Sequence, residues 1–594
     1  MFGKRDSVIP VVVANHWHTV RRSAGTPMTD VWSVERKLRP RRWNSTSIDH
    51  SDVVIVGGGP AGLALATALG TSKPVQEALK ITLVEAGDLS KIRAWSQPDG
   101  YSNRVSSITN ASKGFLEDIG AWPLVEESRT CPIEDMQVWD GISDARITFS
   151  ASDALFQRNL GGQLSQMTEN LNLQRALLHK LSRTPAVELV DQVKVQSITQ
   201  DLENGGWPLV HLSNGRTIRA RLLVGADGFN SPVRSYAGIK SYGWAYNTHA
   251  VVATLNHAPR SALEPPNTTA YQRFLPTGPI AFLPLSETAS SMVWSTKPYL
   301  ASALKALDPA VLAHMINVAF RLPEVSLRYL YDRMLEAQKA GGVISLDALR
   351  DEIAFREKSH SIDSRSAYSS LAITSETSQG IPPDDADSVP PLVTSIQPGT
   401  IASFPLRYSH AEAYIGEGAG ARTALVGDAA HTTHPLAGQG LNAGLGDVES
   451  LAKCIEDAVL KGGDIGSYTS LAPYPRDRYF ENHKLLAAVD KLHKLYSITA
   501  EPVVWARSVG VEVLNELDTV KAAMMMTAGS HRIRRTGREN QQVGLEMAAK
   551  GVEVFASGIN TARTIGEGAL GLLGSVLSQV AKRASAPGSS PRQS

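Results

Sequence analysis

The chain has 594 residues, of which 42% are hydrophobic and 20% are charged, a composition that excludes a disordered protein and allows two or three domains. The 59 Lys and Arg residues nearly balance the 58 Asp and Glu residues, so the formal net charge of +1 argues against nonspecific nucleic-acid binding. Two cysteines, Cys131 and Cys454, are too few for a disulfide framework, a Cys-rich zinc site or an iron–sulfur cluster, so any redox chemistry needs a bound cofactor.

Residues 1–48 form an Arg-rich leader with nine basic residues against three acidic ones. Such a leader is typical of a mitochondrial transit peptide, and we expect cleavage a few residues beyond Arg42. The alternatives are a basic tail or a later start at Met28. No run in the sequence approaches the roughly 20 apolar residues of a membrane-spanning helix, so we expect a soluble or peripheral mature protein.

A β-α-β unit follows the leader. An apolar strand over 52–56 runs into the motif Gly57-x-Gly59-x-x-Gly62, which opens an Ala-rich helix. In this context the glycines predict a tight turn, close approach of the backbone to a pyrophosphate, and close packing of the helix. The next strand, 81–84, ends at Glu85, whose carboxylate is expected to accept the ribose hydroxyls of an adenosine. An acidic residue there disfavours a 2′-phosphate and hence NADP.

Two more strands that run into glycine turns lie far along the chain. Residues 222–224 precede Gly225-Ala226-Asp227-Gly228, and residues 424–426 precede Gly427-Asp428. We therefore expect one domain assembled from separated segments. Between them, alternating and aromatic-rich runs predict an antiparallel sheet as a second domain; the runs are 250–255, 271–275, 280–283 and 291–295. Residues 301–358 have helical spacing, whereas 359–400 are rich in Ser, Thr, Pro and Asp. We expect 360–400 to form a mobile insertion.

The stretch 427–444 predicts a second binding segment. Asp428 follows a strand and can hydrogen-bond a polyol chain, while 438–442 form a glycine-rich loop that opens a helix and directs N–H groups at an anion or an electron-rich ring edge. His431 and His434 have the spacing of metal ligands. We predict no metal, because no further Cys or His ligand is within reach in the sequence.

The C-terminal part has helical spacing from 447 to about 530. Further on, residues 565–581 place several apolar side chains on one helical face, flanked by basic and acidic residues. Such a stripe favours either membrane contact or packing against the core of the protein itself. A Gly/Ser/Pro-rich tail ends the chain.

Taken in this order, the three glycine segments resemble the signatures of single-component flavin aromatic hydroxylases. Four further segments narrow the resemblance to the ubiquinone-biosynthesis hydroxylases: Tyr101 to Ser107, Gln272 to Pro279, Phe404-Pro405-Leu406, and Tyr474 to Asn482. The resemblance covers roughly residues 50–530, and the leader agrees with the mitochondrial branch of that family. It implies an α/β fold with an FAD-binding Rossmann-like domain of the para-hydroxybenzoate hydroxylase type, an antiparallel sheet domain for substrate, and a C-terminal helical region.

The resemblance also implies domain boundaries. They are a transit peptide over 1–48, the FAD-binding domain over 49–150 and 151–235, the substrate sheet over 236–300, an insertion over 301–400 that is partly disordered from 360, the return of the sheet with the Gly-Asp segment over 401–460, C-terminal helices over 461–535, and an extension with an amphipathic helix and tail over 536–594.

The implied activity is FAD-dependent hydroxylation of the aromatic ring of a polyprenyl-4-hydroxybenzoate-type precursor at carbon 5, with O2 activated as a flavin C4a-hydroperoxide. By matching motif positions, the cofactor-binding residues are Gly57, Gly59, Gly62, Glu85, Arg104, Asp227, Asp428, Gly438, Gly440, Leu441 and Asn442. Pro435, Gly438, Gln439 and Gly440 are the candidates to line the flavin. No residue matches a general base, so none is assigned.

The resemblance suggests that electrons pass from NADPH through a ferredoxin and its reductase, although direct reduction by NADPH stays open. It also implies a ubiquinone-biosynthesis protein complex and a peripheral place on the matrix side of the inner membrane. Two alternatives remain: a flavoprotein of the same fold that reduces or dehydrogenates a lipid or isoprenoid, and a non-catalytic flavoprotein subunit of a biosynthetic complex.

Overall fold

The computed structural model describes residues 48–96, 100–152, 162–260, 264–371, 383–435 and 438–516. Residues 1–47 of the transit peptide predicted over 1–48 lie outside the described residues, and residue 48 begins the first strand. The C-terminal extension, with its apolar stripe at 565–581, also lies outside them. No helix in the described part of the chain has the length and apolar character needed to cross a membrane.

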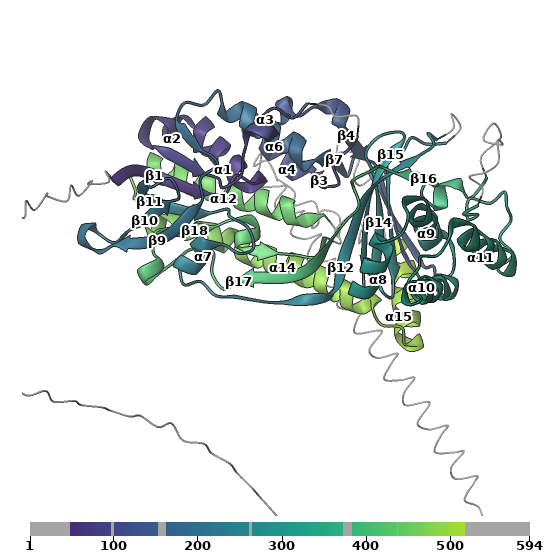
Figure 1. Cartoon of the computed structure of the whole chain (residues 1–594). Helices are drawn as coiled ribbons and strands as arrows, with labels where there is room; N and C mark the ends of the chain where they lie inside the picture. Colours follow the sequence, from purple (N-terminus) through teal and green to yellow (C-terminus); the bar gives the residue numbers. More distant parts are fainter. Residues whose placement is uncertain are drawn as a thin grey trace, which may run out of the picture. The chain divides into compact units, whose positions relative to one another are not determined.

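The first sheet has seven strands and is built from segments far apart in the sequence (Figure 1). Its central strand β1 lies parallel to β2 on one side and to β11 on the other, and β18 continues the sheet beyond β11. This pairing confirms the prediction of one domain assembled from separated segments. The strands are β1 (Ile48–Val56), β2 (Ile81–Val84), β8 (Val187–Val190), β9 (Val195–Asp201), β10 (Trp207–Leu212), β11 (Thr217–Gly225) and β18 (Thr423–Leu425).

Helices cover this sheet because its strands are apolar on both faces. Residues 53–56 of β1 and all four residues of β2 are buried, as expected for parallel strands between two helical layers. Helix α1 (Pro60–Thr71) packs on α6 (Asn170–Leu181) and α12 (Gln439–Leu460), and its buried Leu63, Leu65 and Leu69 join the core of the sheet.

The second sheet has nine strands in the order β19-β17-β12-β15-β14-β13-β5-β6, with β16 beside β12. Its long strand β12 (Ser241–His257) and the hairpins β13 (Thr269–Leu275), β14 (Gly278–Pro284) and β15 (Ala289–Thr296) match the four predicted runs. The remaining strands are β5 (Asp135–Asp140), β6 (Arg146–Ser150), β16 (Val393–Ile396), β17 (Ala402–Ala411) and β19 (His431–Thr432).

The structure corrects the predicted boundary of the first segment. β5 pairs parallel to β13, so residues 135–150 belong to the second sheet rather than to the FAD-binding domain predicted over 49–150. A separate three-stranded sheet of β3 (Val105–Thr109), β4 (Thr130–Ile133) and β7 (Ser165–Glu169) lies between these segments in sequence.

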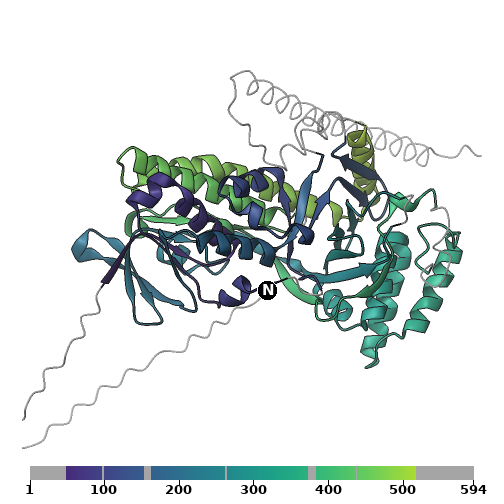
Figure 2. The same ribbon diagram turned by 90° about the horizontal axis from the view of Figure 1, so that it is seen from above.

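Four helices cover one face of the second sheet, as Figure 2 shows for the teal part of the chain. Buried Phe282, Met292 and Trp294 of the sheet pack against Leu312 and Phe320 of this layer. The helices are α8 (Pro298–Lys305), α9 (Pro309–Arg321), α10 (Glu324–Lys339) and α11 (Leu346–Ser359).

The predicted mobile insertion over 360–400 is corrected for its described residues. β16 adds to the edge of β12, and Asn317 of α9 exchanges two hydrogen bonds with Val393, at 2.9 and 3.0 Å. Ser370 N–H donates to the buried Glu357 carboxylate at 2.6 Å. Tertiary partners therefore order a segment whose own composition has no packing pattern. Residues 372–382 lie outside the described part.

The helix α14 (Pro473–Tyr496) joins the two sheets. It packs against α12 of the first layer and lies along β14 and β17 of the second sheet (Figure 1). Helix α15 (Glu501–Asn515) follows, and its buried Arg507 forms an ion pair of 2.6 Å with Asp140 at the end of β5. The C-terminal helices therefore fix the second sheet relative to the first.

Candidate functional site

The glycine motif at 57–62 lies where β1 ends beside β11. Gly57 has a φ of +111°, and a Cβ at this position would overlap the carbonyl of Ala226. A Cβ at Gly62 would overlap the Gly57 carbonyl, whereas a Cβ at Gly59 would meet no atom within 4 Å. The loop is therefore closely packed at Gly57 and Gly62, whereas space remains for a ligand at Gly59. Helix α1 begins here with no side-chain cap and no acidic residue in its first turn, which leaves its N–H groups directed at an anion.

Glu85 lies directly beside this loop. Its carboxylate accepts hydrogen bonds from the backbone N–H of Gly58 and, at 2.6 Å, from that of Gly87. A side chain on Gly58 would overlap Glu85, so the glycine keeps the loop and the carboxylate in contact. The predicted ribose-binding residue is thus just after β2 and beside the loop predicted to bind a pyrophosphate.

Asp227 follows β11 and touches the same loop through its backbone. One carboxylate oxygen accepts from the Val233 N–H at 3.2 Å, while Oδ1 is buried with no hydrogen-bond partner. Desolvation raises the pKa of this carboxyl. A buried acceptor without a partner, next to a glycine cradle, fits a site that a polar ligand completes.

Asp428 lies in the short turn η7 (Gly427–Ala429) after β18, and its side chain is exposed. Desolvation by surrounding protein nevertheless raises the pKa of its carboxyl, and His431 opposes that shift. Arg234, from the segment after Asp227, donates to the Ala429 carbonyl at 2.7 Å. The turn at 427 and the turn at 227 are therefore held together.

The N-terminus of α12 completes this cluster of turns. Gly438 is its N-cap, with a left-handed φ of +60°, and the first turn contains no acidic residue. Asn442 accepts from the Thr109 N–H at 3.0 Å and donates to the Ser107 carbonyl at 2.8 Å, so β3 lies against the start of α12. Further along α12, Gly444 packs closely against Gly427: a Cβ added to Gly444 would lie 3.2 Å from the Cα of Gly427.

The remaining flavin-lining candidates surround this helix start. Pro435, Gln439, Gly440 and Leu441 are half-buried, and Leu441 packs against the core of the first sheet. Residues 436 and 437 lie outside the described part. The predicted loop is therefore placed at a helix N-terminus, as the glycine pattern indicates.

Arg104 precedes β3, and its side chain is exposed. Its neighbours are fixed to the second sheet, because Tyr101 and Gln397 exchange two hydrogen bonds of 2.7 and 2.9 Å, and Asn103 donates to the Thr400 carbonyl at 2.6 Å. The segment that carries Arg104 therefore bridges the cluster of turns and the second sheet.

Asp447 is a central residue that the sequence analysis missed. Its carboxylate is fully buried and accepts from His431 Nε2 at 2.6 Å, Asn482 Nδ2 at 2.8 Å, the Gly427 N–H at 3.1 Å and Arg478 Nε at 3.3 Å. These partners, His431 foremost, lower the pKa of Asp447 despite its burial. One ionised side chain on α12 thus fixes the turn that presents Asp428 and links it to α14.

His434 is buried between Tyr246 of β12 and His493 of α14, with ring centroids at 5.3 and 4.8 Å. Burial lowers the pKa of His434 to about 3, and His493 adds to this shift, so the ring is neutral at pH 7. His431 is instead paired with Asp447. Within the described ranges, no cluster of three or more His, Cys, Asp or Glu side chains has the arrangement of a metal site.

Arg273, from a segment that carried the family resemblance, lies away from the glycine turns. It is buried and donates to the carbonyls of Ala319 and Leu322 at 3.0 and 2.9 Å, at the end of α9. Its position indicates a structural role, which is to fasten the helical layer to the second sheet.

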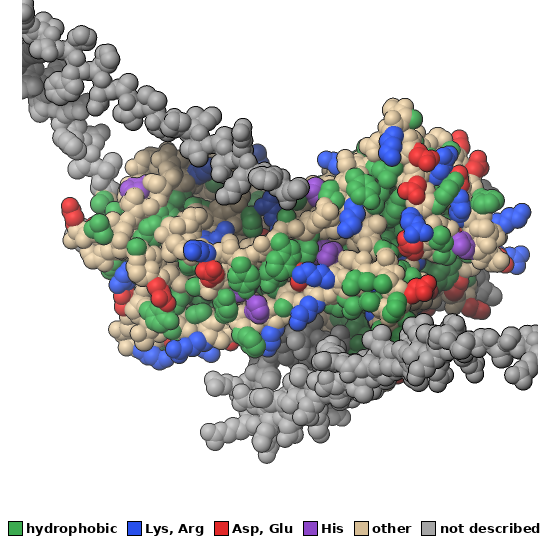
Figure 3. Space-filling model, turned by 90° about the horizontal axis from the view of Figure 1, so that it is seen from below, with side chains coloured by type: hydrophobic (Ala, Val, Ile, Leu, Met, Phe, Trp, Pro, Cys, Tyr) green, Lys and Arg blue, Asp and Glu red, His purple; other side chains and the backbone are tan. Residues whose placement is uncertain are grey.

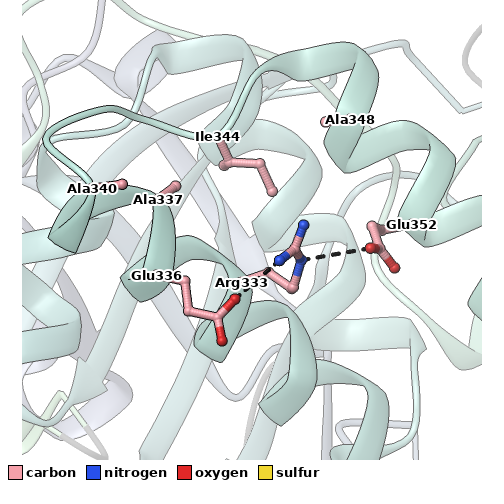
Figure 4. A pocket seen from close by; sticks show the side chains of 7 residues that line it. All are labelled: Arg333, Glu336, Ala337, Ala340, Ile344, Ala348 and Glu352. Atoms are coloured by element: carbon pink, nitrogen blue, oxygen red, sulfur yellow. Dashed lines mark hydrogen bonds and ion pairs between the residues drawn. The ribbon is translucent and has the colours of Figure 1, made fainter.

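A shallow pocket lies between α10 and α11 (Figure 4). Arg333 crosses it, with ion pairs to Glu336 at 3.0 Å and Glu352 at 3.6 Å. No predicted site residue lines this pocket, and paired charges fill its polar side. The cluster of glycine turns remains the candidate site.

The residues of that cluster fit a dinucleotide that carries an anionic pyrophosphate and a polyol chain. The open approach at Gly59, the buried Asp227 oxygen without a partner and the exposed Asp428 lie on three turns that touch one another through Ala226, Ala429 and Gly427. Two helix N-termini without acidic side chains favour the negative charge of such a ligand.

Comparison with known proteins agrees with this arrangement. A family model described as "FAD binding domain" matches residues 50–326 and 386–478. The protein named "Ubiquinone biosynthesis monooxygenase COQ6, mitochondrial" is 38% identical in Schizosaccharomyces pombe, over 81% of this chain and 92% of that protein. The proteins of the same name are 39% identical in Saccharomyces cerevisiae (81% of this chain, 94% of that protein) and 35% identical in Homo sapiens (82% and 94%).

Solved structures show the same fold at low identity. p-Nitrophenol 4-monooxygenase PnpA from Pseudomonas putida has a TM-score of 0.54 at 16% identity, over 82% of this chain and all of that chain. P. aeruginosa PqsL has a TM-score of 0.51 at 19% identity, over 78% of this chain and 99% of that chain.

Proposed function

Because the chain belongs to the ubiquinone-biosynthesis monooxygenase family and carries its FAD-binding domain, we propose that it hydroxylates carbon 5 of a polyprenyl-4-hydroxybenzoate-type ring. The observation that carries this proposal is the extent of the similarity: the match to the FAD-binding family over residues 50–326 and 386–478 includes both the glycine turns and the second sheet. FAD, when bound, supplies the two-electron redox chemistry and the activation of O2 that no amino-acid side chain provides.

The chain itself binds and orients the cofactor in this proposal. The N–H groups at the start of α1, beside the open position at Gly59, would hold the pyrophosphate, and Glu85 would accept the adenosine ribose hydroxyls. Asp428 would bind the polyol chain, and the N–H groups at the start of α12 would favour negative charge on the flavin ring.

The substrate ring lies, we infer, against the face of the second sheet that the helical layer leaves uncovered. Side chains alternate along a strand, so Ala281, Leu283 and Val293 point away from the fully buried Phe282 and Trp294. These three apolar side chains are only half-buried although they lie on central strands, and Ala281 pairs directly with Val293. A small, apolar wall of this kind suits an aromatic ring with a prenyl chain.

The cellular setting is part of the proposal. The Arg-rich leader and the mitochondrial names of the relatives support import into mitochondria, with a peripheral place on the matrix side of the inner membrane and a role in a ubiquinone-biosynthesis complex. Electrons come from NADPH through a ferredoxin and its reductase.

Two measurements on purified protein test this proposal. Bound flavin should be reduced under anaerobic conditions by NADPH with the ferredoxin system, and only slowly by NADPH alone. Oxygen uptake should then match the amount of hydroxylated product. A product that is reduced or desaturated, formed without oxygen uptake, would favour the lipid reductase or dehydrogenase, and purification without any flavin would favour a non-catalytic subunit.

A further inference from the structure

The outward face of α14 exposes large apolar side chains to solvent. Phe480 is 63% exposed, and Leu492, Leu495 and Ile498 are between 38% and 42% exposed; Trp244 of β12, which is 42% exposed, lies beside the helix. Isolated exposed apolar side chains are common, but five that gather on α14, just beyond its C-terminal end and on the neighbouring strand mark a contact surface. We call these five residues the α14 face.

Helical spacing places these residues on one side of the helix. Phe480 and Leu495 lie within about 60° of each other around the axis of α14. Ile498 follows two residues after the helix ends at Tyr496. On the opposite side, Leu486 packs against the second sheet beside Ala250, and Tyr496 stacks on Phe274 with ring centroids 4.0 Å apart. The inner side of α14 is therefore packed against the second sheet, whereas Phe480 on the outer side is mostly exposed to solvent.

Three lysines accompany the apolar side chains. Lys484 Nζ lies 5.0 Å from the Phe480 ring, Lys494 Nζ lies 4.4 Å from the Trp244 ring, and Lys491 is exposed between them on the helix. Figure 3 shows hydrophobic side chains beside Lys and Arg on this underside of the molecule. Lys484 is paired with Glu481 and Lys494 with Asp490, each at 2.7 Å. The three lysines therefore face two carboxylates, and this group of side chains keeps a positive balance.

We propose that the α14 face docks on the surface of an anionic lipid bilayer. Aromatic and aliphatic side chains enter the boundary between headgroups and acyl chains, while lysines extend along them and keep their ammonium groups among anionic headgroups. The helix then lies in the plane of the membrane. The lysines beside the apolar side chains complement anionic headgroups, which favours lipid as the occupant of this face.

This inference rests on the proposed function, because a polyprenylated substrate partitions into a bilayer. The inner side of α14 contacts the same sheet that holds the proposed substrate wall, where Val293 packs near Leu486. A membrane on the outer side of the helix would place the source of the substrate one helix away from the wall that binds it.

Flotation of the full chain with vesicles tests the proposal. We expect flotation with vesicles of phosphatidylcholine and phosphatidylglycerol, and at least about fivefold less with phosphatidylcholine alone or in about 0.5 M salt. The variant Phe480→Ser/Leu495→Ser/Ile498→Ser should lose about tenfold or more of the binding. The variant Lys484→Gln/Lys491→Gln should lose the preference for anionic vesicles.

A matched control carries apolar-to-serine changes elsewhere on the surface. Val343 and Phe355 lie outside the α14 face and are 61% and 62% exposed. The variant Val343→Ser/Phe355→Ser should therefore float like the wild type. Equal flotation of the α14-face variant and the wild type would overturn the proposal. Flotation that is lost on removal of residues 517–594 and is unaffected by the α14-face variant would also overturn it. A third contradicting result would be an α14-face variant that no longer binds an acidic protein but still binds vesicles like the wild type.

Catalysis in detergent separates this proposal from the proposed function. The α14-face variant should keep its flavin spectrum and hydroxylate a short-chain substrate analogue in micelles at the wild-type rate. If the wild type floats but never hydroxylates the analogue, the proposed function fails while the docking face stands. If the wild type hydroxylates the analogue but does not float, only the docking face fails.

Discussion

Asp447 Oδ2 lies 2.6 Å from His431 Nε2, and both side chains are buried between α12 and the turn that carries Asp428. The same oxygen also accepts from the Gly427 N–H at 3.1 Å. Because α12 begins at the glycine loop, one carboxylate fixes both segments that we assign to the flavin half of the cofactor. We therefore expect Asp447 to position the cofactor-binding turns through His431 and Gly427.

The variant Asp447→Asn should bind FAD about tenfold or more weakly and should be destabilised by about 3 kcal/mol, because it leaves Arg478 and His431 buried without a charged partner. Thermal unfolding of apoprotein and of protein with added FAD separates the two effects. The control Glu188→Gln removes a half-exposed ion pair with Arg216 and should cost about 1 kcal/mol or less. An unchanged FAD-dependent shift in Tm for Asp447→Asn would contradict the positioning role.

Gly57→Ala and Gly59→Ala should have different effects. A Cβ at residue 57 would overlap the Ala226 carbonyl, and alanine there would have to adopt a positive φ. The free energy of unfolding of the apoprotein should therefore fall by about 2 kcal/mol or more. A Cβ at residue 59 meets no protein atom, and the backbone there is extended, so the apoprotein should keep its Tm. Gly59→Ala should nonetheless weaken FAD binding, measured by fluorescence quenching, because the pyrophosphate needs that space. Wild-type FAD affinity in Gly59→Ala would remove the phosphate from this position.

Acidification should destabilise the protein through His434. Its pKa is lowered to about 3 in the folded state, so the unfolded state, with a pKa of about 6.5, binds the proton more tightly. The stabilisation that favours the neutral ring is present above about pH 6.5 and is lost as the pH falls toward 3. Between pH 7 and 5 this one residue should account for about 2 kcal/mol of lost stability. Urea unfolding of the wild type and of His434→Phe checks this, and equal pH dependence of the two proteins would refute it.

The variant Ala281→Phe should fill the proposed substrate wall. We expect a loss of about tenfold or more in kcat/KM for the aromatic substrate, with the flavin spectrum and Tm close to wild type. Ala340→Phe, at an exposed position at the end of α10, is the matched control. It should keep the wild-type kcat/KM, flavin spectrum and Tm. Normal turnover in Ala281→Phe would place the substrate elsewhere.

Local patterns explain which parts of the fold were predictable. The glycine spacing at 57–62 and the alternation over 280–283 and 291–295 determine their structures through neighbours in sequence, and the structure confirms them. The parallel pairing of β5 with β13 joins residues more than a hundred positions apart and leaves no local signature. Similarly, β16 is ordered by Asn317 and β12 rather than by its own composition.

Within the site, the partners of Asp447 were also unpredictable from local sequence, although the position of Asp447 itself indicated that it is buried. It lies on the buried side of α12 between Ala443 and Leu451, each one helical turn away. A carboxylate among apolar neighbours at this spacing indicates a buried charge with partners. The partners themselves, His431 and Arg478, come from other elements, and only the fold brings them together.

The most direct measurement of the central claim is the origin of the oxygen in the product. The purified protein, with NADPH and the ferredoxin system, is given a polyprenyl-4-hydroxybenzoate-type substrate under 18O2, and the product is analysed by mass spectrometry. The account predicts one labelled oxygen atom, on ring carbon 5. A product without the label, or with oxygen taken from water, would contradict it.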